Sequence, residues 1–251
     1  IEKDISVICS NSVLPKDGGN IAFRAAELFF RRTGIQKGVR LALDKKIPIA
    51  AGLGGGSSDA AAVLKGLNRY FDYPFDLHEL MRMGTGLGAD VPFFISDYRA
   101  ALAGGIGDRL QPCEIDDNFW ILLVNPGFTV STKWVYDNFT LTTGDISYNL
   151  APELISNLKP NESDTPVMCV RTENIGFFRN DLEKVTINRF PELGDIKNHL
   201  DVNGAGLSLM SGSGPTIFGV FDSETAGSRA LQAIAKRFGS WVFLTKPLNQ
   251  V

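Results

Sequence analysis

Cysteine is scarce in this 251-residue chain, which carries only three cysteines: Cys9, Cys113 and Cys169. They are odd in number and far apart, so the sequence predicts neither a disulfide framework nor a metal or redox site of the CxxC type. Sparse, scattered cysteine is typical of a protein in a reducing compartment. We therefore expect a cytoplasmic protein.

Charge of one sign and long apolar runs are also lacking. The net charge is −3, which leaves no broad basic surface for a polyanion such as DNA or for an anionic membrane. The apolar run "FWILLV" at 119–124 is far shorter than the roughly 18 residues that a membrane helix needs. We expect neither nucleic acid nor a membrane as a partner, and the sequence leaves the oligomeric state open.

Histidine is scarcer still, with His78 and His199 alone. No cysteine, histidine or acidic residue stands at metal-ligand spacing around either of them. We therefore expect both side chains at the surface. The sequence predicts no metal ion that is held by protein side chains alone.

Alternating and helical patterns of apolar residues are mixed along the chain, which predicts an α+β protein. We expect strands at 39–44, 119–124, 216–221 and 241–245. We expect helices after caps at Asn20 and Asp76, after a glycine-rich loop, and at 223–238. The polar stretch "KPNESDTP" at 159–166 predicts a surface loop. The length suits two domains, which we place at 1–115 and 116–251.

The glycine-rich loop, "PIAAGLGGGSSD" at 48–59, joins a predicted strand to a predicted helix. The first N–H groups of a helix lack internal partners and carry partial positive charge, so this position favours a phosphate group. Glycines let phosphate oxygens approach the backbone, and Ser57 and Ser58 add hydroxyl groups. The carboxylate of Asp59 would repel a phosphate, so we expect it to point away or toward a metal ion. A simple linker is the alternative.

Two familiar phosphate-binding motifs do not fit this loop. The Walker A motif needs a lysine followed by serine or threonine after its last glycine, and the chain has "GSSD" there. The dinucleotide-binding pattern needs glycine at its sixth position, which is Ser57 when the count begins at Gly52. The loop therefore predicts a phosphate site of another kind.

Several motifs, in the correct order along nearly the whole chain, resemble the GHMP kinases, named for galactose, homoserine, mevalonate and phosphomevalonate kinases. The loop "PIAAGLGGGSSDAA" is similar to the second motif of that family, and "LMSGSGPTIFGVF" at 209–221 is similar to the third. "LGADVPFF" at 87–94, "NPGFTVSTKWVY" at 125–136 and "NDLEKVTINRFPEL" at 180–193 resemble the members that act on a cytidine diphosphate-linked methylerythritol.

The resemblance implies transfer of the γ-phosphate of ATP to the 2-hydroxyl of that small molecule, with Mg²⁺ arriving with ATP. It implies that Asp90 is the general base, a carboxylate beside the attacking hydroxyl. Gly88 and Ala89 leave room for a substrate, and Pro92 prevents a regular helix from continuing through this segment. From the residue alone, a helix cap is the alternative role of Asp90.

The resemblance also implies a set of nucleotide-binding residues. They are Asn20, Lys45, Pro48, Ile49, Ala50, Ala51, Gly52, Leu53, Gly54, Gly55, Gly56, Ser57 and Ser58. Two of these have plain structural alternatives. A lysine within "DKK" is ordinarily solvated at the surface, and an asparagine ahead of a helix is ordinarily its N-cap.

Substrate-binding residues follow from the same resemblance: Thr132, Tyr136, Gly212, Ser213 and Gly214. A cytosine base stacked on Tyr136 would gain roughly 1 to 3 kcal/mol. The alternative is a helix that starts at Ser131 or Thr132 and half-buries Tyr136. The family's fold implies two domains with the active site in the cleft between them, the glycine-rich loop lying in the first domain and the "SGSGPT" turn in the second.

Two other functions remain open from the sequence. The chain could be another kinase of the family, such as a homoserine or mevalonate kinase, or a nucleotide-binding sensor without transfer activity. The family's opening motif, a strand with a lysine followed by a histidine, has no counterpart in residues 1–19. We therefore expect the natural protein to carry roughly 50 further residues upstream, a length based on typical domain sizes.

Overall fold

The structure is a computed structural model that describes residues 4–10, 13–107, 109–115, 118–140, 178–239 and 241–248, and the backbone of 167–170. Contacts divide the chain into two compact units. Unit 1 consists of Ile1–Ile47 and Gly54–Gln111, and unit 2 of Pro48–Leu53 and Pro112–Val251. The first half of the glycine-rich loop, 48–53, thus belongs to unit 2, and its second half, from Gly54 on, belongs to unit 1. Each unit is described by itself.

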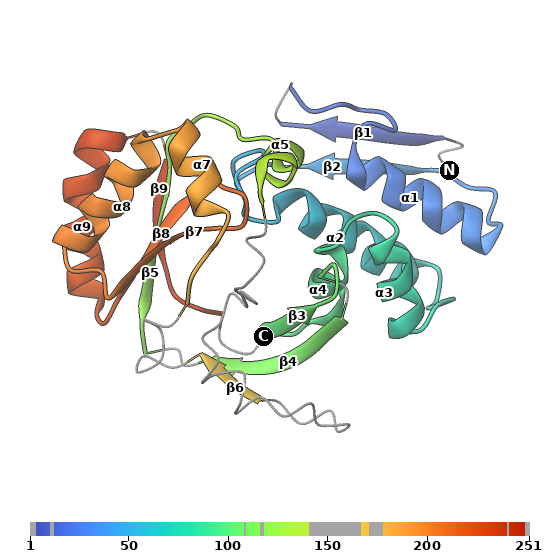
Figure 1. Cartoon of the computed structure of the whole chain (residues 1–251). Helices are drawn as coiled ribbons and strands as arrows, with labels where there is room; N and C mark the ends of the chain where they lie inside the picture. Colours follow the sequence, from blue (N-terminus) through green and yellow to red (C-terminus); the bar gives the residue numbers. More distant parts are fainter. Residues whose placement is uncertain are drawn as a thin grey trace. The chain divides into compact units, whose positions relative to one another are not determined.

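Unit 1 is built around a parallel strand pair and helices (Figure 1). Strand β1 (Ile5–Cys9) pairs with β2 (Val39–Leu43), with Ile5 opposite Val39. A parallel pair needs a crossover connection, which α1 (Ile21–Thr33) supplies. The remaining helices of the unit are α2 (Gly55–Tyr70), α3 (Leu77–Thr85) and α4 (Val91–Ser96).

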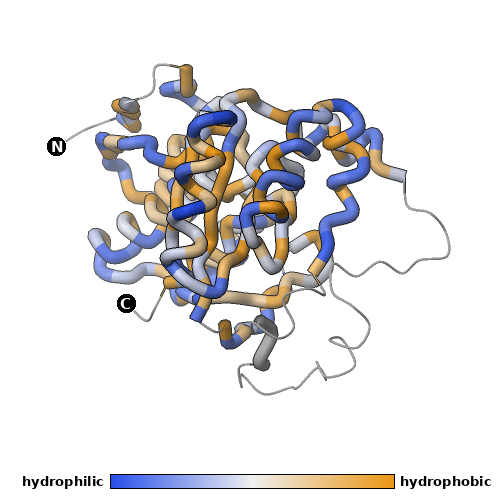
Figure 2. Tube along the Cα trace, turned by 90° about the vertical axis from the view of Figure 1, so that its left-hand side faces the viewer, coloured by the Kyte–Doolittle hydropathy of each residue, from blue (hydrophilic) through white to orange (hydrophobic). Residues whose placement is uncertain are grey.

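Alanines bring the two long helices of unit 1 together. The fully or almost fully buried residues Ala22, Ala25 and Ala26 of α1 and Ala60 and Ala61 of α2 belong to one core. Small side chains at a helix contact permit a close approach of the two axes. Phe29 and Leu64, both fully buried, complete the apolar side of these helices. Figure 2 shows polar and apolar residues alternating along the helical parts of the trace.

Unit 2 contains an antiparallel sheet with the strand order β7-β8-β5-β9. Its strands are β5 (Trp120–Asn125), β7 (Leu207–Met210), β8 (Ile217–Phe221) and β9 (Trp241–Thr245). Helices α8 (Glu192–Val202) and α9 (Glu224–Phe238) pack on the same side of this sheet (Figure 1). Leu122, Leu200 and Ile234 are fully buried where these helices meet the strands. Unit 2 also contains two shorter helices, α5 (Thr132–Asn138), with the predicted site residues Thr132 and Tyr136, and α7 (Glu183–Arg189).

A second sheet has the order β3-β4-β6, formed by β3 (Ala100–Gly104), β4 (Arg109–Ile115) and β6 (Val167–Val170). Strands β4 and β6 are parallel, with Cys113 opposite Val167. Cys113 is disulfide-bonded, whereas Cys9 is free. The sequence predicted no disulfide framework, and it did not predict this single bond at Cys113.

The strands and helices expected from periodicity are confirmed where the structure describes them. Asp76 caps α3 in a complete capping box, accepting from the backbone N–H of Glu79 while the Glu79 side chain accepts from the backbone N–H of Asp76. Pro92 needs a correction, because it lies in the first turn of α4, where proline is tolerated. The predicted loop at 159–166 lies outside the described residues. Among the described helices, none is long and apolar enough to cross a membrane.

Candidate active site

The start of α2 depends on a glycine in the left-handed region. Gly54 is the N-cap, with φ +64°. A Cβ at this position would lie 2.7 Å from the ring of Phe94. The carbonyl oxygen of Gly54 accepts the first helical hydrogen bond, from the N–H of Ser58 at 2.9 Å. Both the backbone conformation and the space therefore require glycine here.

The first turn of α2 leaves backbone donors open. Glycine at the N-cap provides no side chain to satisfy the N–H groups of Gly55, Gly56 and Ser57, and no hydrogen bond to them is found among the described residues. The hydroxyl of Ser58 donates to the carbonyl of Gly55 at 2.9 Å. The free N–H groups and the positive end of the helix dipole suit an anion.

Lys45 is held beside this helix. Its Nζ lies 2.6 Å from Oδ2 of Asp59 and 3.3 Å from the carbonyl oxygen of Gly55, and its side chain is only 9% exposed. The alternative of a solvated surface lysine is therefore wrong. Asp59 gains a cationic partner, which offsets the repulsion that its carboxylate would exert on a phosphate. A second ion pair, between Lys46 and Asp44, lies next to it in the sequence, and both of its side chains are exposed. Lys46 lowers the pKa of the Asp44 carboxyl by a hydrogen bond and by its charge.

The first half of the glycine-rich loop is bound to the turn at 211–216 within unit 2. The hydroxyl of Ser211 donates to the carbonyl of Gly52 at 2.7 Å, and the N–H of Thr216 donates to the carbonyl of Ala51 at 3.3 Å. Gly52 has φ +73°, and a Cβ there would lie 2.2 Å from the carbonyl oxygen of Ser211. Only glycine permits this close approach of the two backbones.

Asp90 lies at the N-cap position of α4, but its side chain makes no capping hydrogen bond. The residue is exposed. Among the described residues, none forms a hydrogen bond or an ion pair with its carboxylate. The capping alternative is therefore wrong, and the carboxylate is available to a ligand.

Asn20 is a helix cap, as its structural alternative predicted. Its Oδ1 accepts from the N–H of Ala22 at 2.9 Å, and its Nδ2 donates to the carbonyl of Pro15 at 2.9 Å. The residue is only 5% exposed. These contacts account for its burial, and a contact between Asn20 and a nucleotide stays a prediction.

In unit 2, predicted substrate-binding residues of α5 lie beside those of the turn at 211–214, called here the glycine turn. The hydroxyl groups of Thr132 and Ser213 lie 2.9 Å apart at hydrogen-bonding distance. Ser131 caps α5 by accepting from the N–H of Trp134 at 3.2 Å, so the predicted helix start is confirmed. Tyr136, one turn after Thr132, is 61% exposed rather than half-buried. Its ring is thus free to stack on a ligand.

Two residues that contact the glycine turn, Asn180 and Glu183, were not predicted as site residues from the sequence. Asn180 donates to the carbonyl groups of Met210 and Gly212, and Glu183 accepts from the N–H of Met210. Gly212 and Gly214, the predicted substrate-binding glycines, have φ +55° and +84°. Asn180 and Glu183 belong to the segment "NDLE" at 180–183, but nothing in that motif alone indicates which backbone groups they bind.

No metal centre is formed by the described residues, which contain no group of three or more His, Cys, Asp or Glu side chains that could hold an ion. His78 is exposed as expected. His199 is partly buried, and its ring packs edge-on against Phe238 at a centroid distance of 5.1 Å. The expected surface position is thus confirmed for His78, and His199 is partly exposed with its ring against Phe238.

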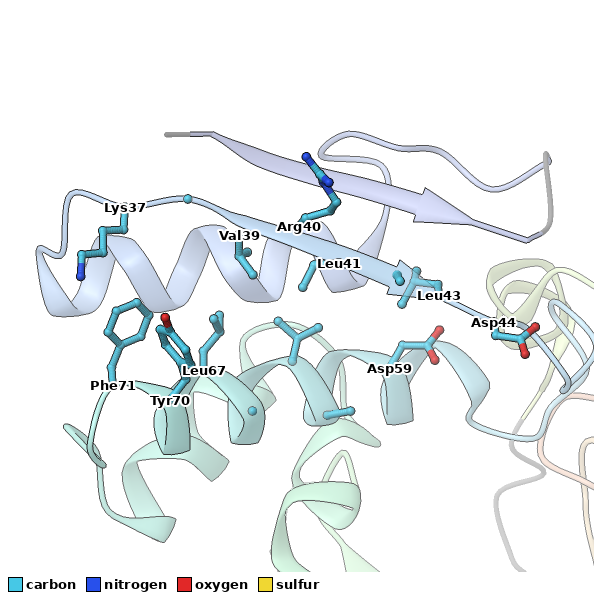
Figure 3. Close-up of a pocket in the computed structure, with 15 residues that line it drawn as sticks. Lys37, Val39, Arg40, Leu41, Leu43, Asp44, Asp59, Leu67, Tyr70 and Phe71 are labelled. Carbon is cyan, nitrogen blue, oxygen red and sulfur yellow. The ribbon is translucent and has the colours of Figure 1, made fainter. Parts of the chain in front are cut away.

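A hollow of about 700 Å³ in unit 1 lies between β2 and α2 (Figure 3). Val39, Leu41 and Leu43 point from the strand toward the helix, and Leu67 points back toward them. The side chains that face each other across the hollow are therefore apolar, whereas charged residues, among them Lys37 and Asp59, also line it.

Comparison with known families identifies the class. The model of the GHMP kinases N-terminal domain matches residues 20–98, and that of the GHMP kinases C-terminal domain matches residues 172–240. The chain belongs to the GHMP kinase family and has its two-domain α+β fold.

Within that family, the chain is 44% identical to the 4-diphosphocytidyl-2-C-methyl-D-erythritol kinase of Syntrophotalea carbinolica, over 98% of this chain and 82% of the relative. A solved structure of a 4-(cytidine 5′-diphospho)-2C-methyl-D-erythritol kinase is 30% identical, with a TM-score of 0.75 over 98% of this chain and 82% of the other. The homoserine kinase of Cytophaga hutchinsonii also gives a TM-score of 0.75, over 97% of this chain and 82% of that chain, at 20% identity. This last likeness concerns the fold alone.

Proposed function

We propose that the protein transfers the γ-phosphate of ATP to the 2-hydroxyl of 4-diphosphocytidyl-2-C-methyl-D-erythritol, a step in the non-mevalonate synthesis of isoprenoid precursors. The 44% identity to a curated kinase of that name, over 98% of this chain, carries the proposal. The bound hydroxyl oxygen forms a bond to the γ-phosphorus while the bond from that phosphorus to the bridging oxygen breaks, and ADP leaves.

ATP binds by its phosphate groups at the glycine-rich loop, Pro48–Ser58. Two observations support this assignment: the open N–H groups of Gly55, Gly56 and Ser57, and the ammonium group of Lys45 held within 3.3 Å of the Gly55 carbonyl. Donors fixed by a helix keep their positions during the reaction, so they stabilise charge without reorganising. The anion-binding start of α2 fits a polyphosphate.

Asp90 accepts a hydrogen bond from the acceptor hydroxyl and takes its proton as the new bond forms. The exposed carboxylate and its missing cap bond support this role. The main contribution of Asp90 is to orient the hydroxyl toward phosphorus, with proton transfer occurring late.

The acceptor binds by its cytidine group in unit 2. Tyr136 stacks on the base, and Thr132, Ser213 and the glycines at 212 and 214 surround the molecule with hydroxyl and backbone groups. The exposure of Tyr136 and the contact between Thr132 and Ser213 support this placement. A stacked base contributes about 1 to 3 kcal/mol.

Mg²⁺ reaches the enzyme with ATP, and the cell compartment that supplies both substrates is the cytoplasm. Magnesium commonly keeps several waters and binds through substrate phosphates with one or two carboxylates, so a dedicated cluster of protein ligands is not required. When bound, the ion neutralises phosphate charge.

The proposal is tested with labelled ATP and a panel of acceptors that contains 4-diphosphocytidyl-2-C-methyl-D-erythritol, homoserine and mevalonate. We expect a kcat/KM for the cytidylated alcohol at least about 100-fold above that for homoserine or mevalonate, because unpaired polar groups in the site discriminate against the wrong acceptor. Preference for homoserine or mevalonate would replace the proposed substrate. ATP binding without transfer to any acceptor would instead indicate a nucleotide sensor.

A further inference from the structure

The glycine turn at 211–214 is held by a side chain that lies outside it. Nδ2 of Asn180 donates to the carbonyl oxygens of Met210 at 2.8 Å and of Gly212 at 2.7 Å. The first acceptor is at the end of β7, and the second is inside the turn. One amide group therefore fixes the turn relative to the strand that precedes it.

The orientation of the Asn180 amide is determined by its partners. Its Oδ1 accepts from the N–H of Leu182 at 3.0 Å, just before α7 begins. Carbonyl oxygens only accept and an N–H only donates, so the amide nitrogen must face the turn and the amide oxygen must face the helix. Asparagine is the side chain of this size that meets both demands.

Glu183 is the second anchor of the same backbone. Its Oε1 accepts from the N–H of Met210 at 2.7 Å, and its Oε2 lies 2.5 Å from Nζ of Lys197 on α8. The Glu183 side chain is only 14% exposed, so this hydrogen-bonded charge pair is largely shielded from water. Met210 is thus bound at both its N–H and its carbonyl group.

The glycine turn also holds the first half of the glycine-rich loop. The hydroxyl of Ser211 donates to Gly52, and the backbones of the two segments are so close that a Cβ on Gly52 would collide. Ser213 extends the connection to Thr132 on α5. Every one of these groups belongs to unit 2.

We propose that Asn180, assisted by Glu183, is a positioning residue that sets the place of the phosphate-binding loop through the turn at 211–214. This inference rests on the proposed function, in which the loop holds the ATP phosphates. Displacing a binding group by about 1 Å can cost about 100-fold in rate, so a clamp of this kind affects a ligand that it does not itself contact.

The decisive variant is Asn180→Asp. The carboxylate has the same size and still accepts from the N–H of Leu182, so the start of α7 is retained. Its other oxygen faces two carbonyl oxygens, cannot donate to them when ionised, and repels the turn. We expect the Kd for MgATP, measured by titration calorimetry without acceptor, to rise by about tenfold or more.

Asn188→Ala is the matched control, because Asn188 is exposed on α7, the helix that follows Asn180. Its Kd should stay within about twofold of the wild type. Asn180→Ala removes the donors without adding charge, so its Kd should lie between those of the wild type and Asn180→Asp. All Kd values for MgATP are measured at a temperature well below the thermal unfolding midpoint of each variant. If Asn180→Asp does not fold, the Kd of Asn180→Ala decides instead, and a value within about twofold of the wild type counts against the proposal.

A Kd for Asn180→Asp within about twofold of the wild type would overturn the positioning role and leave Asn180 a structural residue at the start of α7. Failure of the proposed function is a separate result. If the wild type binds MgATP but does not phosphorylate the cytidylated acceptor, that function fails, while the order of the Kd values still tests the clamp. Absence of MgATP binding by the wild type would overturn both.

Discussion

Asp90 combines a helix-cap position with a side chain that does not cap. An aspartate at such a position usually binds the free N–H groups of the first turn. Here the carboxylate is exposed and none of the described residues pairs with it. These features favour a role of the Asp90 carboxylate in contacting a ligand over a role in stabilising the fold.

Asp90→Asn should reduce kcat by about 100-fold or more, because a positioned base typically contributes 10² to 10⁴. The amide keeps the size of the side chain but loses the charge that attracts the hydroxyl proton. The Kd for ATP should change little. Steady-state kinetics with the cytidylated acceptor measure the first effect, and calorimetry measures the second.

Asp97 supplies a matched control for that variant. It lies at the other end of α4, is exposed, and forms its ion pair with Lys65 at the surface. Its φ of +61° is a conformation that asparagine tolerates, so Asp97→Asn should fold and retain its turnover. Near-normal turnover in Asp90→Asn would exclude Asp90 as the base.

Tyr136→Ala should raise the KM for the cytidylated acceptor by about 5-fold to 150-fold, the equivalent of one lost stacking contact of roughly 1 to 3 kcal/mol. The KM for ATP should stay unchanged. Tyr136→Phe retains the ring and should behave as the wild type. An equal rise in both KM values for Tyr136→Ala would show that the cytidine pocket lies elsewhere.

At the scale of elements, α2 shows how one helix uses glycine in two ways. Gly54 stands at its start with φ +64° and the ring of Phe94 against it, so the residue is needed for the turn. Gly66 stands inside the helix, and a Cβ added there would meet no atom within 4 Å. The first glycine permits the left-handed turn that starts the helix, and the second weakens the middle of the helix.

Gly54→Ala should lower the free energy of unfolding by about 1 to 3 kcal/mol, through left-handed strain and contact with Phe94. Gly66→Ala should raise it by up to about 1 kcal/mol, because alanine favours the helix. Urea unfolding of both variants measures the difference. Equal stability of Gly54→Ala and the wild type would contradict the structural role of Gly54.

Local sequence patterns were sufficient to predict the helices and strands of this fold, but they could not predict contacts between residues that are far apart in the sequence. The caps at Asn20 and Asp76 were predictable because a capping side chain binds backbone only a few residues away. The pairing of Lys45 with Asp59 was not, because those residues are 14 positions apart and meet only after β2 and α2 have packed. For the same reason, the contact of Asn180 with Met210, 30 positions away, was not predictable from the sequence.

At the scale of the whole molecule, each unit has its own buried core and contains some of the residues proposed for the active site. Unit 1 contains the start of α2, Lys45 and Asp90, and unit 2 contains the glycine turn, Thr132 and Tyr136. The chain passes from one unit to the other within the loop at 48–58. Family membership covers both units, since the N-terminal model of the GHMP kinases matches 20–98, in unit 1 except for 48–53, and the C-terminal model matches 172–240, within unit 2.

Transfer of phosphate to the 2-hydroxyl is tested most directly by NMR of the product, with an acceptor labelled with ¹³C at carbon 2 and with MgATP. We expect one new phosphate monoester whose phosphorus couples to the labelled carbon, with one ADP formed for each product molecule. Release of inorganic phosphate with the acceptor unchanged, or an ester on a different hydroxyl, would contradict the proposed reaction.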